Sequence, residues 1–127
     1  MEEITANVNW LAVVVGAVLA FALGWFWYSK MAFGPKWAAA HGVDVNDPAM
    51  PVEAMVAQAA GTFLLAWVVG VTAAGEALMT FILIILAIAV LVYAGNLFAR
   101  KGGEVALIDA GYIVAMGVIL FVVQAVF

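Results

Sequence analysis

The stretch NWLAVVVGAVLAFALGWFWY, residues 9–28, carries no charged side chain over about twenty positions. A helix of that length spans about 30 Å, which is the thickness of the hydrocarbon core of a bilayer. Aromatic rings gather where it ends, and such rings settle at the headgroup level of a membrane. The stretch therefore predicts a transmembrane helix whose interface anchors are Trp25, Trp27, Tyr28 and, a little further along, Trp37.

The composition of the whole chain agrees with a membrane protein. Of 127 residues, 69% are hydrophobic and 9% are charged, and the mean hydropathy is +1.23. Twelve charged side chains, four basic and eight acidic, cannot form the charged surface that a water-soluble protein needs. Cysteine is absent, which excludes disulfides and cysteine metal sites. A net charge of −4 without a basic cluster argues against a nucleic-acid partner.

Four apolar segments are each long enough to span a bilayer, at about residues 9–28, 52–72, 78–98 and 105–127. They show no alternation of period two, so helices are expected rather than a β-barrel. The start, Met1-Glu2-Glu3, lacks the positive charge of a signal peptide, so we expect the first helix to be retained. The predicted fold is an all-α integral membrane bundle of four transmembrane helices, forming one domain over residues 1–127.

The basic residues predict the orientation of these helices. All four lie in two loops, Lys30 and Lys36 after the first helix and Arg100 and Lys101 after the third. Lysine and arginine favour the cytoplasmic side. We therefore expect loops 29–51 and 99–104 in the cytoplasm, both termini outside (periplasmic), and a multi-pass protein of the bacterial inner (plasma) membrane.

The first loop is the longest, and it contains signals for a short helix. Pro35 suits the first turn of a helix, and Gly42 suits the position just after its end at His41. With Trp37 among the lipid headgroups, a short interfacial helix is predicted over residues 35–41.

Small residues recur at steps of four along the first helix. Such a stripe lets another helix approach closely, and dispersion then holds the two together in lipid. The pattern predicts a helix-packing face, and we expect it to support a homo-oligomer or attachment to a larger membrane complex. Its members are Ala12, Gly16, Ala20 and Gly24.

A polar cluster is expected where the third and fourth helices fold back on each other about Gly102 and Gly103. In that antiparallel arrangement Asn96 faces Asp109, just inside the cytoplasmic boundary. An ionisable group at such depth needs a partner. Asp109 then either pins the helices together or acts as a proton- or cation-handling group. The candidate ligand or ion residues are Asp109, Asn96, Tyr93, Tyr112, Arg100 (by snorkelling) and Glu53.

Other chemistries have weak support. His41, Asp44 and Asp47 are spaced like a loose metal loop, but a zinc or calcium site needs more ligands. Ser29 lacks the glycines of a nucleophile elbow. We expect no catalytic residue, no metal and no cofactor.

Three runs resemble a known family: NWLAVVVGAVLAFALGWFWYS, then FGPKW, and LIDAGY in the fourth helix. They are similar to a bacterial group of small membrane proteins, the domain of unknown function 1761. The resemblance implies a four-helix integral membrane protein, and it implies no particular reaction, substrate or cofactor.

Two classes of function follow. The first is a non-enzymatic binding or assembly protein, meaning an accessory subunit or a holder of a lipid or small apolar ligand. The alternative is a small-solute or proton-coupled transporter or channel that uses the Asp109/Asn96 cluster. The outer halves of the third and fourth helices are almost wholly apolar, which makes transport the second choice.

Overall fold

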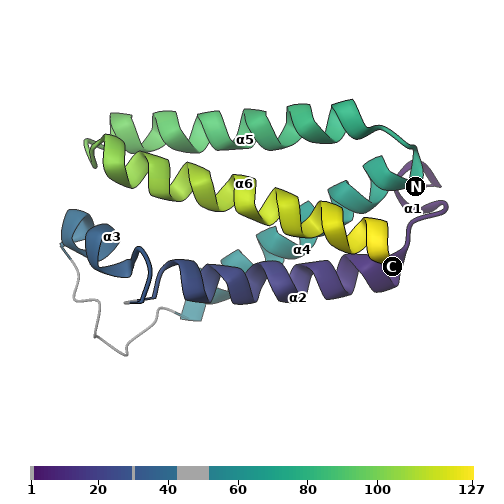
Figure 1. Ribbon diagram of the computed structural model, residues 1–127, viewed down its shortest axis with the longest axis horizontal. Coiled ribbons are helices and arrows are strands. Elements are labelled where there is room, and N and C mark those ends of the chain that lie inside the picture. Colours follow the sequence, from purple (N-terminus) through teal and green to yellow (C-terminus); the bar gives the residue numbers. More distant parts are fainter. Residues whose placement is uncertain (1, 30, 43–51) are drawn as a thin grey trace.

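A computed structural model describes residues 2–29, 31–42 and 52–127, and in this part of the chain the regular elements are six helices (Figure 1). In chain order they are α1 (Glu2–Thr5), α2 (Trp10–Trp27), α3 (Gly34–His41), α4 (Val52–Ala74), α5 (Leu78–Phe98) and α6 (Gly103–Val126).

Four of these helices, α2, α4, α5 and α6, are long and apolar enough to cross a membrane. They have 18 to 24 residues each and mean hydropathies from 1.8 to 2.7. Each occupies one of the four apolar segments, with ends that differ by at most two residues from the sequence-based bounds. The chain is therefore a small all-helical protein with four candidate membrane spans. The short helix α1 was not anticipated.

The ends of the helices follow from local chemistry. The side chain of Asn9 accepts the backbone N–H of Ala12 at 3.1 Å, so Asn9 caps α2 rather than belonging to it. Pro35 lies in the first turn of α3, and Gly42 ends that helix in the left-handed region, with φ of 68°. Gly102, with φ of 94°, allows the tight turn from α5 into α6.

The long helices are packed in an open arrangement. Helix α2 lies against both α4 and α6, and α5 packs along α6 (Figure 1). By contrast, α4 and α5 diverge from their short connection, and α4 crosses towards the far end of α2 (Figure 1). The bundle is thus well packed around α2 and α6 and open between α4 and α5.

The core lies between α2, α4 and α6, with α5 closing one side through Phe81 and Ile85. The most enclosed large side chains are Val13 and Leu120. Small residues of α2 face this core. A Cβ on Gly16 would lie 2.8 Å from Leu120 Cδ2. The chain itself therefore fills the small-residue face of α2, whose members Ala12, Gly16 and Ala20 are buried, and that face gives no support to a homo-oligomer.

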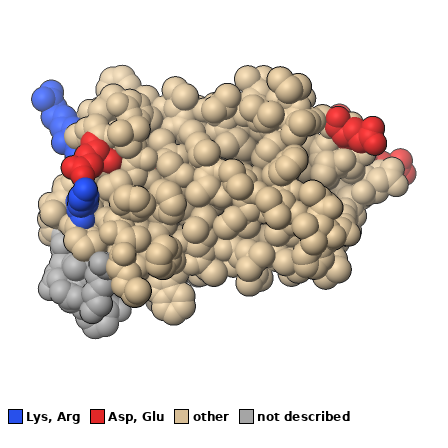
Figure 2. Space-filling view, viewed as in Figure 1, with Lys and Arg blue, Asp and Glu red and all other residues tan. Residues whose placement is uncertain are grey.

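The two ends of the bundle differ in charge. Both termini lie at the end that carries α1 and the α4–α5 connection, whereas α3 and the α5–α6 turn lie at the other end (Figure 1). Acidic side chains and no basic ones appear at the first end, and the lysine and arginine side chains in view lie at the second (Figure 2). We call these the acidic end and the basic end.

Candidate functional site

Asp109 joins three helices near the basic end of the bundle. Its Oδ1 accepts the hydroxyl of Tyr28 at 2.5 Å, and its Oδ2 accepts the amide Nδ2 of Asn96 at 2.9 Å. The Asn96 amide also donates to the carbonyl of Val92, one turn back in α5, at 3.1 Å. We call Tyr28, Asn96 and Asp109 the carboxylate clamp, because they connect the end of α2, the last turns of α5 and the first turns of α6.

Further long-range hydrogen bonds surround the carboxylate clamp. The indole Nε1 of Trp27 donates to the carbonyl of Ile108 at 3.0 Å. The buried Tyr112 hydroxyl donates to the carbonyl of Ala20 at 2.9 Å and also contacts the side-chain amide of Gln58. The ring of Tyr28 packs edge-on against that of Tyr112, with centroids 5.6 Å apart. This region therefore fixes how α2 sits against α6.

The chemistry of the carboxylate clamp is that of a structural joint. Both oxygens of Asp109 already accept a hydrogen bond from a neighbouring helix. A carboxylate held in this way meets the requirement that an ionisable group at membrane depth has a partner. Each oxygen accepts one hydrogen bond and keeps a further lone pair, so the two bonds satisfy Asp109 as a joint between helices without using its whole acceptor capacity.

The structure brings together only part of the predicted polar cluster. Asn96 and Asp109 meet, and Tyr112 lies beside them through Tyr28. The other three predicted members do not join. The Tyr93 hydroxyl lies near Gly103, about 4.0 Å from where a Cβ would stand there, while Arg100 and Glu53 are exposed at helix ends.

Tyr28 is the residue of the carboxylate clamp that we did not predict from the sequence as part of the polar cluster. Its position at the end of the first helix marked it only as an interface anchor, and its depth does match that of Asp109. Depth alone does not say which face of α2 turns towards α6. The small residues of α2 mark the face that packs against α6, because Ala20 and Gly24 lie against Tyr112.

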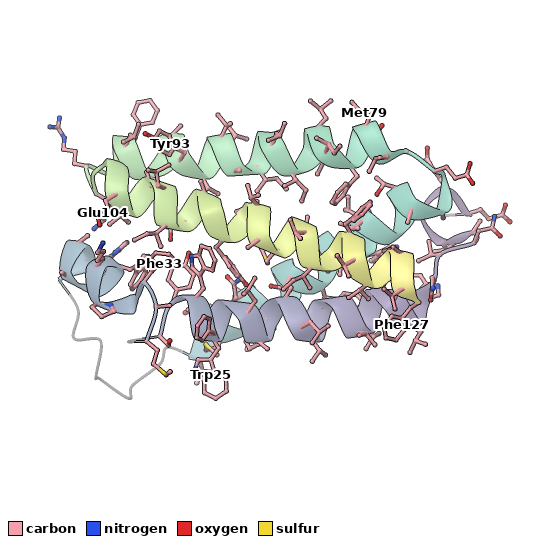
Figure 3. The ribbon with its side chains drawn as sticks, viewed as in Figure 1. Trp25, Phe33, Met79, Tyr93, Glu104 and Phe127 are labelled. Atoms are coloured by element: carbon pink, nitrogen blue, oxygen red, sulfur yellow. The ribbon has the colours of Figure 1, made fainter. Side chains whose placement is uncertain are left out.

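The four predicted interface anchors differ in whether they point outward or contact other parts of the chain. Trp25 is 77% exposed and projects from the bundle (Figure 3), whereas Trp27 and Tyr28 make the internal contacts described above. Trp37 stacks on His41 with ring centroids 3.9 Å apart, and the Nδ1 of His41 lies 2.8 Å from the Trp37 carbonyl.

The loose metal loop lies largely outside the described residues, because Asp44 and Asp47 belong to the segment that is not described. Within residues 2–29, 31–42 and 52–127, no group of three His, Cys, Asp or Glu side chains is arranged to hold a metal ion.

A groove of about 290 Å³ lies near the acidic end, beside the α4–α5 connection. Its walls come from α4, α5 and α6, and two aromatic rings, Phe81 and Phe121, are stacked in it with centroids 5.9 Å apart. We call it the lateral groove. Its lining is mostly apolar and consists of Val69, Thr72, Ala73, Glu76, Ala77, Leu78, Phe81, Phe121, Gln124 and Ala125.

A second, smaller groove of about 240 Å³ lies at the basic end, between α3 and α6. Trp27 and Phe33 form part of its wall, and an ion pair lies beside it. In that pair the ammonium of Lys36 is 2.7 Å from a carboxylate oxygen of Glu104, and both side chains are 65% exposed. Figure 3 shows Phe33 and Glu104 close together at this end.

The family of the chain is decided by a match to one family model, described as a protein of unknown function (DUF1761), over residues 11–125. The chain belongs to the DUF1761 family. The match covers the four candidate spans except the first residue of α2 and the last of α6, and it includes the carboxylate clamp and every lining residue of the lateral groove. Neither the curated proteins nor the solved structures gave a match to this DUF1761 chain, so the site must be interpreted from its own geometry.

Proposed function

We propose that this DUF1761 protein is a non-enzymatic membrane protein that holds one acyl chain of a bilayer phospholipid in the lateral groove. The observation that carries the proposal is the gap between α4 and α5, which leaves an apolar hollow along Phe81 and Phe121. In a bilayer, lipid chains have direct access to such a sideways opening.

The size and lining of the groove favour a chain over a larger ligand. Pockets for drug-sized molecules measure about 300–1,000 Å³ and contain several convergent polar groups. The lateral groove, at about 290 Å³, lies just below that range, and its polar residues are Thr72, Glu76 and Gln124. The hydroxyl of Thr72 is already bonded to the carbonyl of Val69 at 2.8 Å. The apolar lining of the lateral groove is therefore suited to a flexible apolar chain.

Transport through the carboxylate clamp has less support. Both Asp109 oxygens are engaged, and the core that continues towards the acidic end is built of Met116, Leu120 and Val13. A pathway for a solute or proton would need polar groups or water along that route. These observations favour a structural role for Asp109.

We also propose that the protein is not an enzyme. The same proposal includes the orientation of the chain in the membrane. Among the described residues, Asp109 is the acidic side chain that lies farthest from the end of its span, and its two oxygens accept the Tyr28 hydroxyl and the Asn96 amide in a joint between helices. The basic end, with α3 as an interfacial helix, faces the cytoplasm of a bacterial cell, and the termini lie outside. Assembly with a second copy or another membrane protein would use exposed apolar faces, such as that of α5.

Native mass spectrometry of the protein extracted gently from its own membrane tests the proposal. One phospholipid should stay bound to the wild-type chain. Ala73→Leu and Ala125→Leu, which fill the lateral groove, should remove it. Ala87→Leu, on an exposed part of α5 outside the groove, is the matched control and should keep it. Loss in all three variants, retention in all three, or a bound apolar metabolite or protein subunit in place of phospholipid would contradict the proposal.

A further inference from the structure

Two polar residues line the end of the lateral groove that is nearest the ends of the spans, which we call its mouth. An acyl chain in the apolar part of the groove would not need them. Glu76 lines the groove from the α4–α5 connection, and Gln124 lines it from the last turns of α6. Both residues lie at the level where the spans end, which is where a phospholipid headgroup would be if its chain entered the groove. They are therefore placed to contact the headgroup.

The charge at this mouth is negative and is not compensated nearby. Glu76 is exposed and forms no ion pair with another described side chain. Every lysine and arginine that the structure describes, namely Lys36, Arg100 and Lys101, belongs to α3 or the α5–α6 turn at the basic end (Figures 1 and 2). An anionic headgroup at the mouth would meet a carboxylate without a cation to balance it, whereas an ammonium group would be attracted.

The amide of Gln124 adds a hydrogen-bond donor to this mouth. No hydrogen bond from its side chain to another described residue is present, and its Nε2 lies 3.3 Å from where a Cβ on Gly70 would stand, so the amide lies against α4. An N–H donor and a carboxylate that line the same groove match the two charges of a zwitterion, with phosphate oxygen on the amide and ammonium on the carboxylate.

We infer that the lateral groove selects a phospholipid whose headgroup carries a primary ammonium, with Glu76 binding the ammonium and Gln124 the phosphate. A primary ammonium has three N–H donors for the carboxylate, as a lysine side chain does. A trimethylammonium headgroup has the same charge but no such donor, and a glycerol headgroup leaves the lipid anionic. This inference rests on the proposed function and adds the class of lipid.

The test uses the full chain in nanodiscs that contain phosphatidylethanolamine, phosphatidylcholine and phosphatidylglycerol in equal amounts, and it measures the lipid retained by native mass spectrometry. Phosphatidylethanolamine should be enriched roughly two- to fivefold over the bulk mixture, the range that one exposed charged contact provides. Glu76→Gln should abolish the enrichment while a lipid is still retained. Glu3→Gln, which changes a carboxylate of α1 outside the groove, should preserve it.

The outcomes separate the two proposals. If the wild-type chain retains lipid in bulk proportions, or prefers phosphatidylglycerol or phosphatidylcholine, the headgroup assignment is wrong while the acyl-chain proposal stands. The headgroup assignment is also wrong if Glu76→Gln keeps the preference or if Glu3→Gln loses it. If no lipid is retained by the wild-type chain, both proposals fail.

Discussion

The hydroxyl of Tyr28 and the carboxylate of Asp109 are joined by a hydrogen bond of 2.5 Å although the two residues are 81 positions apart. The bond connects the end of the first span to the start of the last one. With Asn96 on the other carboxylate oxygen, it holds three helices at one depth near the basic end. The open side of the bundle, between α4 and α5, can exist because this joint and the core around α2 and α6 hold the rest together.

Removing the Tyr28 hydroxyl should destabilise the protein. Tyr28→Phe deletes a donor to a carboxylate, and we expect the free energy of unfolding in detergent to fall by about 1–2 kcal/mol. In the background of Asp109→Ala, where the acceptor is gone, the same change should cost much less, so a double-mutant cycle isolates the bond. Tyr93→Phe is the matched control, because its hydroxyl is not part of the carboxylate clamp, and it should stay within about 0.5 kcal/mol of wild type. If Tyr28→Phe lowered the free energy of unfolding equally in the wild-type and Asp109→Ala backgrounds, the hydrogen bond between Tyr28 and Asp109 would contribute nothing to stability.

A methyl group on Gly24 should separate α2 from α6. The Cβ would lie 2.5 Å from the Tyr112 hydroxyl oxygen and 3.0 Å from the Tyr112 Cζ. That hydroxyl cannot easily move away, because it donates a hydrogen bond to the carbonyl of Ala20. Gly24→Ala should therefore lower stability by about 1–3 kcal/mol, measured by thermal unfolding. Gly61→Ala, where no atom lies within 4 Å, should be neutral or slightly stabilising. Equal stability of the two variants would contradict the packing of α2 on α6.

The ion pair at the smaller groove should contribute little. Lys36 and Glu104 are both 65% exposed, and exposed pairs typically contribute about 0–1 kcal/mol because solvent screens them. Glu104→Gln should shift the midpoint of thermal unfolding only slightly, and the shift should shrink further in high salt. A large loss of stability that persists in high salt would mean that this pair holds α3 on α6 far more strongly than its exposure implies.

The sidedness can be measured directly because the chain has no cysteine. A single cysteine at Lys101 should be protected from a membrane-impermeant maleimide in intact cells, since the basic end is predicted to face the cytoplasm. A single cysteine at Glu3 should be labelled. The reverse pattern would invert the topology and would place the mouth of the lateral groove at the cytoplasmic surface.

Much of the helical architecture could be predicted from the sequence because the bilayer imposes it. A spanning segment must satisfy its backbone hydrogen bonds internally, so length and hydropathy alone locate α2, α4, α5 and α6. The pairing of Asn96 with Asp109 could also be predicted, because a turn of only a few residues places those positions opposite each other. Both predictions depend on local geometry.

The contacts that the sequence did not reveal depend on how distant helices are rotated. Tyr28 reaches Asp109 only because the small-residue face of α2 packs against α6 within one chain, and the same stripe is compatible with packing against a second copy. The lateral groove was missed for a related reason. Apolar residues such as Phe81 and Phe121 look alike in a sequence whether they face lipid, a neighbour or a hollow between helices.

Photo-crosslinking tests most directly whether a lipid chain occupies the groove between α4 and α5. The protein would be reconstituted with phosphatidylethanolamine that carries a photoreactive group near the end of one acyl chain, and the labelled peptides would be mapped. We expect the label to concentrate on the groove, at residues such as Phe81, Phe121 and Ala125. Label spread evenly over the outward residues of α5, such as Leu83 and Leu91, would contradict the occupation of the groove by a lipid chain.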